Sequence, residues 1–331
     1  MPSSQDSRVD NICHTLVGAA LARTGLRRRT VLASGTMMIG ANFPDIDIVS
    51  AAFGRSLEFR RGWTHGVLAM VVLPFVLTGL VLLWDRYRRR GKKRAVPREI
   101  LLLSALSIWT HPTLDWMNSY GMRWLMPFDG TWFYGDSLFI VDPWLLIVLG
   151  LGVWLSRRRE NRDDPHPWRP ARIAVAVASV YIVSMLALQA RAEGIAAAHF
   201  ATTGQAREKL VVSASPGHPL IWRFHADDGT RYTMGVVQVM NGTIDIDAQA
   251  LDKGANHALV ATAVRSEEAR AFMDWARLPF YTVLTTPQGT SVRITDARYG
   301  ATVLVPVDPV PPNTSALEPY RQLSLGTTLP R

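Results

Sequence analysis

The chain has 331 residues, which permits more than one domain, and its formal net charge is +9. Its single cysteine, Cys13, excludes an intrachain disulfide and a zinc ribbon. The charge does not predict a nucleic-acid partner. Residues 191–331 hold 13 Lys/Arg and 13 Asp/Glu, so the whole excess lies in residues 1–190, beside long apolar runs.

Six apolar segments predict a helical membrane domain, and the predicted fold class is therefore mainly α. They are residues 12–22, 31–43, 66–84, 99–115, 140–155 and 173–190. Residues 66–84 and 173–190 carry no charge over 19 and 18 positions, enough for a helix to cross the ~30 Å hydrocarbon layer. Residues 12–22 and 31–43 are too short to span easily at ~1.5 Å per residue, so a buried or re-entrant helical pair is the alternative there.

Three basic stretches orient these segments. Residues 23–29 carry four arginines, residues 86–98 eight cations without an acid, and residues 156–172 six cations against three acids. The positive-inside rule places all three in the cytoplasm and both chain termini outside. The outer ends of the segments then carry eight ionisable side chains: His14, Asp45, Asp47, His65, His111, Asp115, Asp136 and Asp142. We therefore expect a multi-pass protein of the inner membrane with these groups on the extracytoplasmic side.

Histidines and carboxylates at one membrane level predict a metal site. Neutral imidazoles and carboxylates suit Zn²⁺, and less selectively Mn²⁺ or Fe²⁺. His111 and Asp115 lie four residues apart and so share one face of a helix, although Pro112 disfavours helical geometry at His111. A bound divalent ion lowers the pKa of water to about 7, which supplies hydroxide near neutral pH. The number of groups permits one ion or two.

Five motifs in order carry a family resemblance. The runs DNICHTLVGAAL, NFPDIDIV, RGWTHGVL, THPTLDWMNSYG and YGDSLFIVDPWLL resemble the YdjM-type family of membrane-bound metal-dependent hydrolases, over residues 9–155. The pattern His, Asp, His, then His-x-x-x-Asp is similar, more distantly, to the zinc-dependent phospholipase C and P1-type nuclease group, helical enzymes that cleave phosphate esters. That resemblance implies five metal ligands: His14, Asp45, His65, His111 and Asp115.

The chain departs from the soluble enzymes after this pattern, because no histidine lies between His111 and His166. Either the site holds one or two ions, or Asp136 and Asp142 supply further ligands. The structural alternative for Asp136 and Asp142 is that they cap the helix that follows.

The remaining polar groups have hypothetical catalytic roles beside structural alternatives. Asp45 and Asp47 are catalytic candidates, since the one that holds no metal can act as general base toward the attacking water. Both can instead form a turn that ends a helix. Arg60 and Arg61 are candidates for binding a substrate phosphate, or they face anionic lipid headgroups.

The composition and residue pattern of the chain change after the last apolar segment. We expect a helical membrane domain at residues 1–198 and a small, extracytoplasmic, mostly antiparallel β-rich domain at residues 199–331. Short β-rich runs such as TRYTMGVVQVM alternate there with turn signals such as PGHP and DDGT. Residues 262–277 predict one amphipathic helix, and the last 20 residues a loose tail. This domain can cover the metal site, select substrates or bind a partner.

These features favour an integral membrane hydrolase that cleaves a phosphate ester of a lipid or lipid-linked substrate. An interfacial site meets membrane lipids at high local concentration, which motivates that choice of substrate. The alternative is a non-catalytic membrane protein with a structural metal site and a partner-binding β domain. Transport ranks last, because it predicts charges at mid-membrane and the sequence places them at the edge.

Overall fold

The computed structural model describes residues 4–53, 56–88, 93–204, 207–287 and 289–307. The loose C-terminal tail expected from the sequence lies outside these residues. The chain forms two compact units that divide between Leu251 and Asp252. Each unit is described by itself, and the domain boundary expected after residue 198 stays a prediction.

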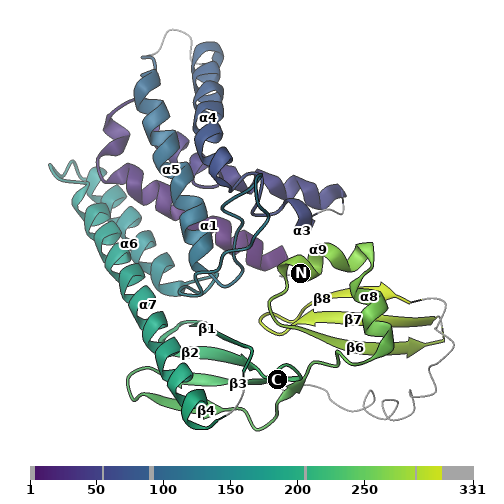
Figure 1. Cartoon of the computed structure of the whole chain (residues 1–331). Helices are drawn as coiled ribbons and strands as arrows, with labels where there is room; N and C mark the ends of the chain where they lie inside the picture. Colours follow the sequence, from purple (N-terminus) through teal and green to yellow (C-terminus); the bar gives the residue numbers. More distant parts are fainter. Residues whose placement is uncertain (1–3, 54–55, 89–92, 205–206, 288, 308–331) are drawn as a thin grey trace. The chain divides into compact units, whose positions relative to one another are not determined.

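The first unit begins with a set of packed helices (Figure 1). In chain order they are α1 (Ser4–Arg23), η1 (Leu26–Arg28), α2 (Ala33–Gly40), η2 (Phe43–Phe53), α3 (Ser56–Phe59), α4 (Val67–Arg88), α5 (Pro97–Met117), α6 (Pro143–Glu160) and α7 (Arg169–Thr202), where η marks a 3-10 helix. Helix α1 packs against α2, α6 and α7, while α4 packs against α5, and α6 against α7. Because α5 returns alongside α4, its last turn lies near the residues that precede α4.

The expectation of six membrane-spanning segments is wrong. Among the described residues, two helices are long and apolar enough to cross a membrane: α4, with 22 residues, and α7, with 34. Helix α2 has only eight residues, about 12 Å at 1.5 Å per residue, and the first half of α1 is polar. Helices α5 and α6 are 21 and 18 residues long, but each includes charged side chains. The folded helices thus contain polar turns that the shorter apolar segments leave out.

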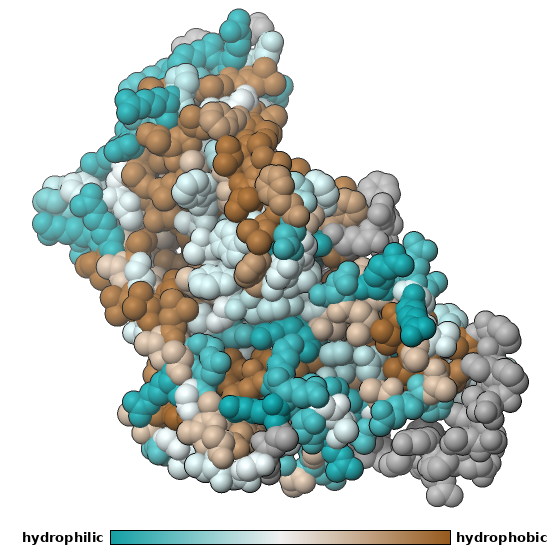
Figure 2. All heavy atoms as spheres, in the orientation of Figure 1, coloured by the Kyte–Doolittle hydropathy of each residue, from teal (hydrophilic) through white to brown (hydrophobic). Residues whose placement is uncertain are grey.

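The two candidate spans expose their apolar side chains. Only 28% of the most apolar stretch of α4, and 17% of that of α7, is buried within the protein. Phe75 and Leu80 on α4, and Val180 and Val183 on α7, are each more than half exposed. Figure 2 shows hydrophobic residues gathered on the surface of the helical part. Exposed apolar helix faces of this kind are typical of helices that contact membrane lipid.

An antiparallel sheet completes the first unit. Its strands are β1 (Lys209–Ser215), β2 (His218–Asp227), β3 (Arg231–Gln238), β4 (Thr243–Ile246) and β5 (Leu251–Asp252), in the order β1-β2-β3-β4 with β5 paired to β3. Trp222 lies opposite Val237, and Phe224 opposite Gly235. The predicted turn sequences carry glycines in the left-handed region, for example Gly217 with φ of 69° and Gly229 with φ of 95°.

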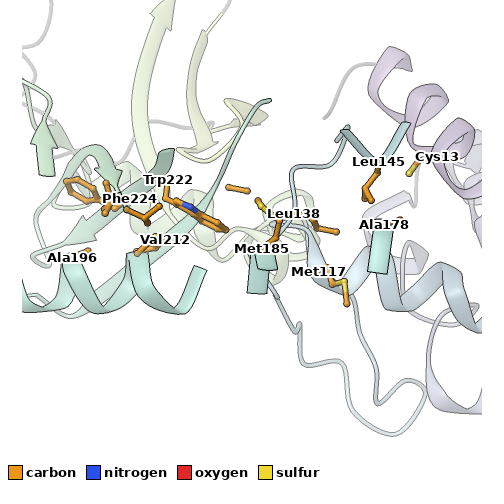
Figure 3. Close-up of a cluster of buried hydrophobic side chains, with 14 of the residues drawn as sticks. Cys13, Met117, Leu138, Leu145, Ala178, Met185, Ala196, Val212, Trp222 and Phe224 are labelled. Carbon is orange, nitrogen blue, oxygen red and sulfur yellow. The ribbon is translucent and has the colours of Figure 1, made fainter. Parts of the chain in front are cut away.

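One apolar core joins these helices to the sheet. The C-terminal half of α7 packs against β1 to β4, with Ala196 and Phe200 against Val212 and Phe224. Figure 3 shows the same core continuing between the helices. The β-rich character predicted for the C-terminal part is confirmed, and this sheet shares its core with α7.

The second unit holds two short helices and a second sheet. They are α8 (Ala258–Val264), α9 (Glu267–Trp275), β6 (Pro279–Thr286), β7 (Gly289–Asp296) and β8 (Ala301–Pro306), with β6-β7-β8 antiparallel. The single helix predicted over residues 262–277 is therefore wrong. Ser266 interrupts it, because its side chain accepts a hydrogen bond from the backbone amide of Ala269 and starts a new helix.

Candidate metal centre

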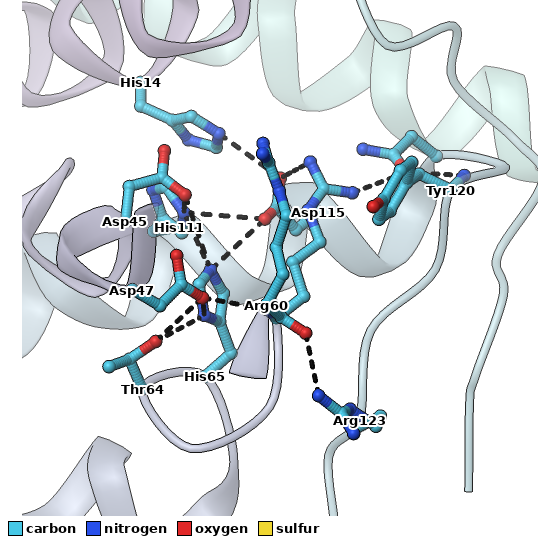
Figure 4. Close-up of polar contacts among 12 residues, drawn as sticks. His14, Asp45, Asp47, Arg60, Thr64, His65, His111, Asp115, Tyr120 and Arg123 are labelled. Atoms are coloured by element: carbon cyan, nitrogen blue, oxygen red, sulfur yellow. Dashed lines mark hydrogen bonds and ion pairs between the residues drawn. The ribbon is translucent and has the colours of Figure 1, made fainter. Parts of the chain in front are cut away.

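Three separate elements bring four potential ligands together (Figure 4). Asp45 lies in the first turn of η2, and His65 lies two residues before α4. His111 and Asp115 lie one turn apart on α5, which continues as a helix through Pro112. One potential ligand atom from each of the four lies within 4.8 Å of all the others. We call these four residues the metal group.

The distances within the metal group match one tetrahedral ion. The Nε2 atoms of His65 and His111 are 3.1 Å apart, and Asp115 Oδ2 lies 3.4 and 3.5 Å from them. Asp45 Oδ1 lies 3.8 and 3.5 Å from the same two nitrogens. Two ligands that each lie ~2.0–2.1 Å from a tetrahedral zinc ion are about 3.4 Å apart. Five of the six distances are thus close to this value, and the sixth, between Asp45 and Asp115, is within 4.8 Å, so the four side chains could hold a divalent ion.

Both histidines are oriented by contacts on their far ring nitrogens. His111 Nδ1 lies 2.7 Å from the carbonyl oxygen of Ala41. Because a carbonyl only accepts, the imidazole proton is on Nδ1, and neutral His111 presents the Nε2 lone pair to the metal group. His65 Nδ1 lies 2.9 Å from Thr64 Oγ1 and 3.4 Å from Asp47 Oδ2. Contacts of this kind fix the tautomer and ring orientation of metal-bound histidines.

The family model described as YdjM inner membrane protein matches residues 9–192. The chain belongs to this family. No curated protein and no solved structure matches the chain. The matched residues include all four members of the metal group, and the family description places the protein in the inner membrane.

In this YdjM-family protein the two aspartates of the PDID motif have different surroundings. The Asp45 side chain belongs to the metal group and is 14% exposed. Asp47 is buried behind His65, where its Oδ2 accepts hydrogen bonds from the backbone amide of Arg61 at 2.8 Å and from Thr64 at 3.1 Å. The geometry thus makes Asp47 a positioning residue for His65, a distinction that the sequence leaves open.

His14 lies beside the metal group without belonging to it. Its ring stacks on His111 with centroids 3.9 Å apart, and His65 and His111 have centroids 5.0 Å apart. His14 Nε2 is 3.4 Å from Asp115 Oδ1, whereas the other oxygen of Asp115 faces His65 and His111. The three predicted histidines thus converge, and Asp115 contacts all three.

The two candidate arginines also differ. Arg61 is buried, and its guanidinium donates to Asp115 Oδ1 at 2.9 Å and to Asn118 Oδ1 at 3.1 Å. It therefore holds Asp115 in place. Arg60 is half-buried, with its guanidinium carbon 5.8 Å from the centre of the Tyr120 ring, and is the freer of the two to meet a substrate. Asn118 and Tyr120 are contacts that the sequence does not predict, although both follow Asp115 within the motif THPTLDWMNSYG.

Asp136 and Asp142 lie outside the metal group. Asp142 accepts hydrogen bonds from the backbone amides of Trp144 and Leu145, both at 3.0 Å, so its predicted role as a helix cap is confirmed. Its second oxygen accepts from Tyr181 on α7 at 2.8 Å. Asp136 is buried with φ of 52°, and its carbonyl accepts from Ala214 of β1 at 3.1 Å.

The metal group is electrostatically coupled. Burial raises the pKa of Asp45, but the charge and hydrogen bond of His111 outweigh burial, so the pKa is lowered well below its usual range. Burial lowers the pKa of His65, but hydrogen bonds to Asp115 and Asp47 outweigh it, so the pKa is raised above 6.5. Without a metal ion, the carboxylates therefore hold protons on the imidazoles. A cation held by the same four side chains would displace those protons.

Proposed function

We propose that this YdjM-family protein is an integral membrane metal-dependent hydrolase that cleaves a phosphate ester of a lipid or lipid-linked substrate. The observation that carries the proposal is the convergence of two imidazoles and two carboxylates within 4.8 Å, with Asp45 on the exposed side of the group. Zinc fits this donor set best, and Mn²⁺ or Fe²⁺ fits less selectively. Inner-membrane residence of the family supports a lipid substrate.

The chain's own residues would divide the work. The metal group would hold a divalent ion, which when bound would supply a water nucleophile near neutral pH. Asp45 is the most exposed member, so water and substrate reach the group on its side, while His65 and His111 are fully buried. Arg60 lies beside these residues in Figure 4, and its guanidinium would hold a phosphate through two hydrogen bonds. Asp47 and Arg61 hold His65 and Asp115 in position.

We place the metal group and the first sheet on the extracytoplasmic side, with α4 and α7 facing the membrane lipid and with α5 and α6 crossing beside them, packed against α4 and α7. Helix α4 starts two residues after His65 and ends in the basic stretch at residues 86–98. Helix α7 starts in the basic stretch at residues 156–172 and ends just before β1. The positive-inside rule supports this orientation.

Metal analysis of the purified full-length chain tests the site. We expect the wild-type protein to retain a divalent ion, and His111→Ala to lose it, because a buried ligand is removed from the metal group. His218→Ala is the matched control, since His218 is exposed at the start of β2. An ion retained in full by His111→Ala would overturn the assignment.

A screen of phosphodiester and phospholipid substrates, with and without chelator, tests the reaction. We expect hydrolysis that chelation removes and that His218→Ala retains. Loss of product in Arg60→Gln with metal content unchanged would support the phosphate-binding role of Arg60.

A structural metal site is the second candidate. Four protein ligands at tetrahedral spacing are typical of structural zinc, whereas catalytic zinc keeps one position for water or substrate. X-ray absorption spectroscopy of the zinc-loaded protein, which counts the ligands on the ion, separates the two candidates. Four protein ligands with no water, together with no chelator-sensitive hydrolysis, would favour a structural ion and a β-rich part that binds a partner.

A further inference from the structure

A basic pocket lies apart from the metal group, where the C-terminal end of α1 meets the turn between α6 and α7. It is a small, partly open hollow at the protein surface. Its lining includes Arg23, Arg27, Arg28, Ser156 and Trp168. These residues come from the first and third basic stretches of the sequence, which are far apart in the chain and adjacent in the fold.

The positive charge of this pocket is only partly neutralised. Arg23 donates to Glu160 at 3.1 Å, and Arg27 pairs with the same carboxylate. Arg28 has no acidic side chain within salt-bridge distance among the described residues, and its guanidinium lies 4.8 Å from the centre of the Trp168 ring. Arg172 reaches the same ring from α7, at 5.8 Å. Glu160 thus holds two arginines in place, and the pocket keeps a net positive charge suited to an anion.

Apolar surface continues from the pocket along both neighbouring helices. Helix α7 begins at Arg169, directly after Trp168, and exposes Ile173 and Val177 on its following turns. Helix α6 exposes Trp154 just before the pocket. An anion with acyl chains can therefore place its charged group among the arginines and its chains against these helices. A free phosphate would leave that apolar surface unused.

We propose that this pocket binds the phosphate of an anionic phospholipid, with Arg28 as its main contact and Trp168 beside the glycerol backbone. Basic pockets between helices at a membrane surface bind lipid headgroups of this class. Tryptophan is enriched at the same membrane level because its ring is amphipathic. This inference is independent of the metal group, since no residue is shared between the two sites.

Native mass spectrometry of the full-length protein, released from detergent micelles, tests the proposal. We expect retention of dioleoyl-phosphatidylglycerol but not of dioleoyl-phosphatidylcholine. Arg28→Gln should weaken retention about tenfold, the loss expected for one charge-assisted hydrogen bond. Arg29→Gln is the matched control, because it removes one charge from the next residue, which pairs with Glu99 instead of lining the pocket.

Three results would overturn the proposal. Equal retention of the two lipids would show that the pocket does not select for a headgroup with a net negative charge. Equal losses in Arg28→Gln and Arg29→Gln would show general attraction to basic surface. Displacement of the lipid by an equal concentration of glycerol 3-phosphate would identify a soluble phosphate ester as the ligand. Arg28→Lys, which keeps the charge, should retain most of the binding and guards against a folding defect in the glutamine variant.

Discussion

At the residue scale, metal affinity depends on side chains that touch no metal. Asp47 is two residues from Asp45 in the sequence, yet it contacts the far nitrogen of His65 and the backbone of Arg61. The PDID motif therefore supplies one ligand and one residue that orients another ligand. The sequence alone does not distinguish these two carboxylates, because the local pattern does not determine the direction in which each side chain points.

Asp47→Asn should weaken zinc binding 10- to 100-fold without abolishing it, the range expected when the residue that orients a metal-bound histidine is changed. Competition with a chromogenic chelator measures the affinity, and His218→Ala again serves as control. Complete loss of zinc would instead make Asp47 a direct ligand.

Zinc affinity should fall as the pH falls, starting above pH 6.5. The pKa of His65 is raised in the ion-free protein, and only neutral imidazole binds zinc, so protons compete with the metal below that raised value. Chelator competition across a pH series measures the onset. Asp47→Asn removes one of the groups that raise this pKa and should move the onset to lower pH. An onset at or below 6.5 in the wild-type protein would contradict the prediction.

At the element scale, α5 continues through an internal proline, and α6 begins at an aspartate that caps it. Pro112 does not break α5, so His111 and Asp115 remain one turn apart and both belong to the metal group. Asp142 starts α6 by accepting two backbone amides, and it joins α6 to α7 through Tyr181. Its role is thus structural within the described contacts.

Asp142→Ala should lower the free energy of unfolding by about 1 kcal/mol, the usual cost of losing a helix cap. Chemical denaturation in detergent, followed by circular dichroism, measures this change. Asp142→Asn keeps a capping oxygen and should stay close to wild type, with metal content unchanged in both variants. Metal loss in Asp142→Asn would instead identify Asp142 as a ligand.

At the scale of the whole molecule, the first sheet and the helices form one folding unit. The α7 residues Ala192, Ala196 and Phe200 are buried in the core that they share with the sheet. The second unit contributes no residue to the metal group, which lies entirely within the first.

A chain that ends at Lys253 should keep its metal content and its unfolding midpoint, because it retains the first sheet. A chain that ends at Gly204 should be much less stable, because it exposes the apolar face at the end of α7. Metal analysis and denaturation of both truncated chains measure the difference. Equal stability of the two chains would show that the sheet and the helices fold independently.

Several features follow from local sequence alone. The apolar runs at residues 66–84 and 173–190 correspond to α4 and α7, and the turn signals after residue 210 separate real strands. The spacing of His111 and Asp115 places both on one helix face. These features depend on periodicity and composition over a few turns, which the sequence states directly.

Tertiary structure alone decided the rest. The helix boundaries that the fold sets reduced six expected spans to two candidates, because α2 has only eight residues and α5 and α6 include charged side chains. Tertiary structure also chose Asp45 over Asp47, paired Arg61 with Asp115, and assigned Asp142 to a helix end. Each of these outcomes depends on which distant segments meet and how their side chains turn. The meeting of distant segments is determined by packing of the whole chain, and residues that are neighbours in the sequence do not determine it.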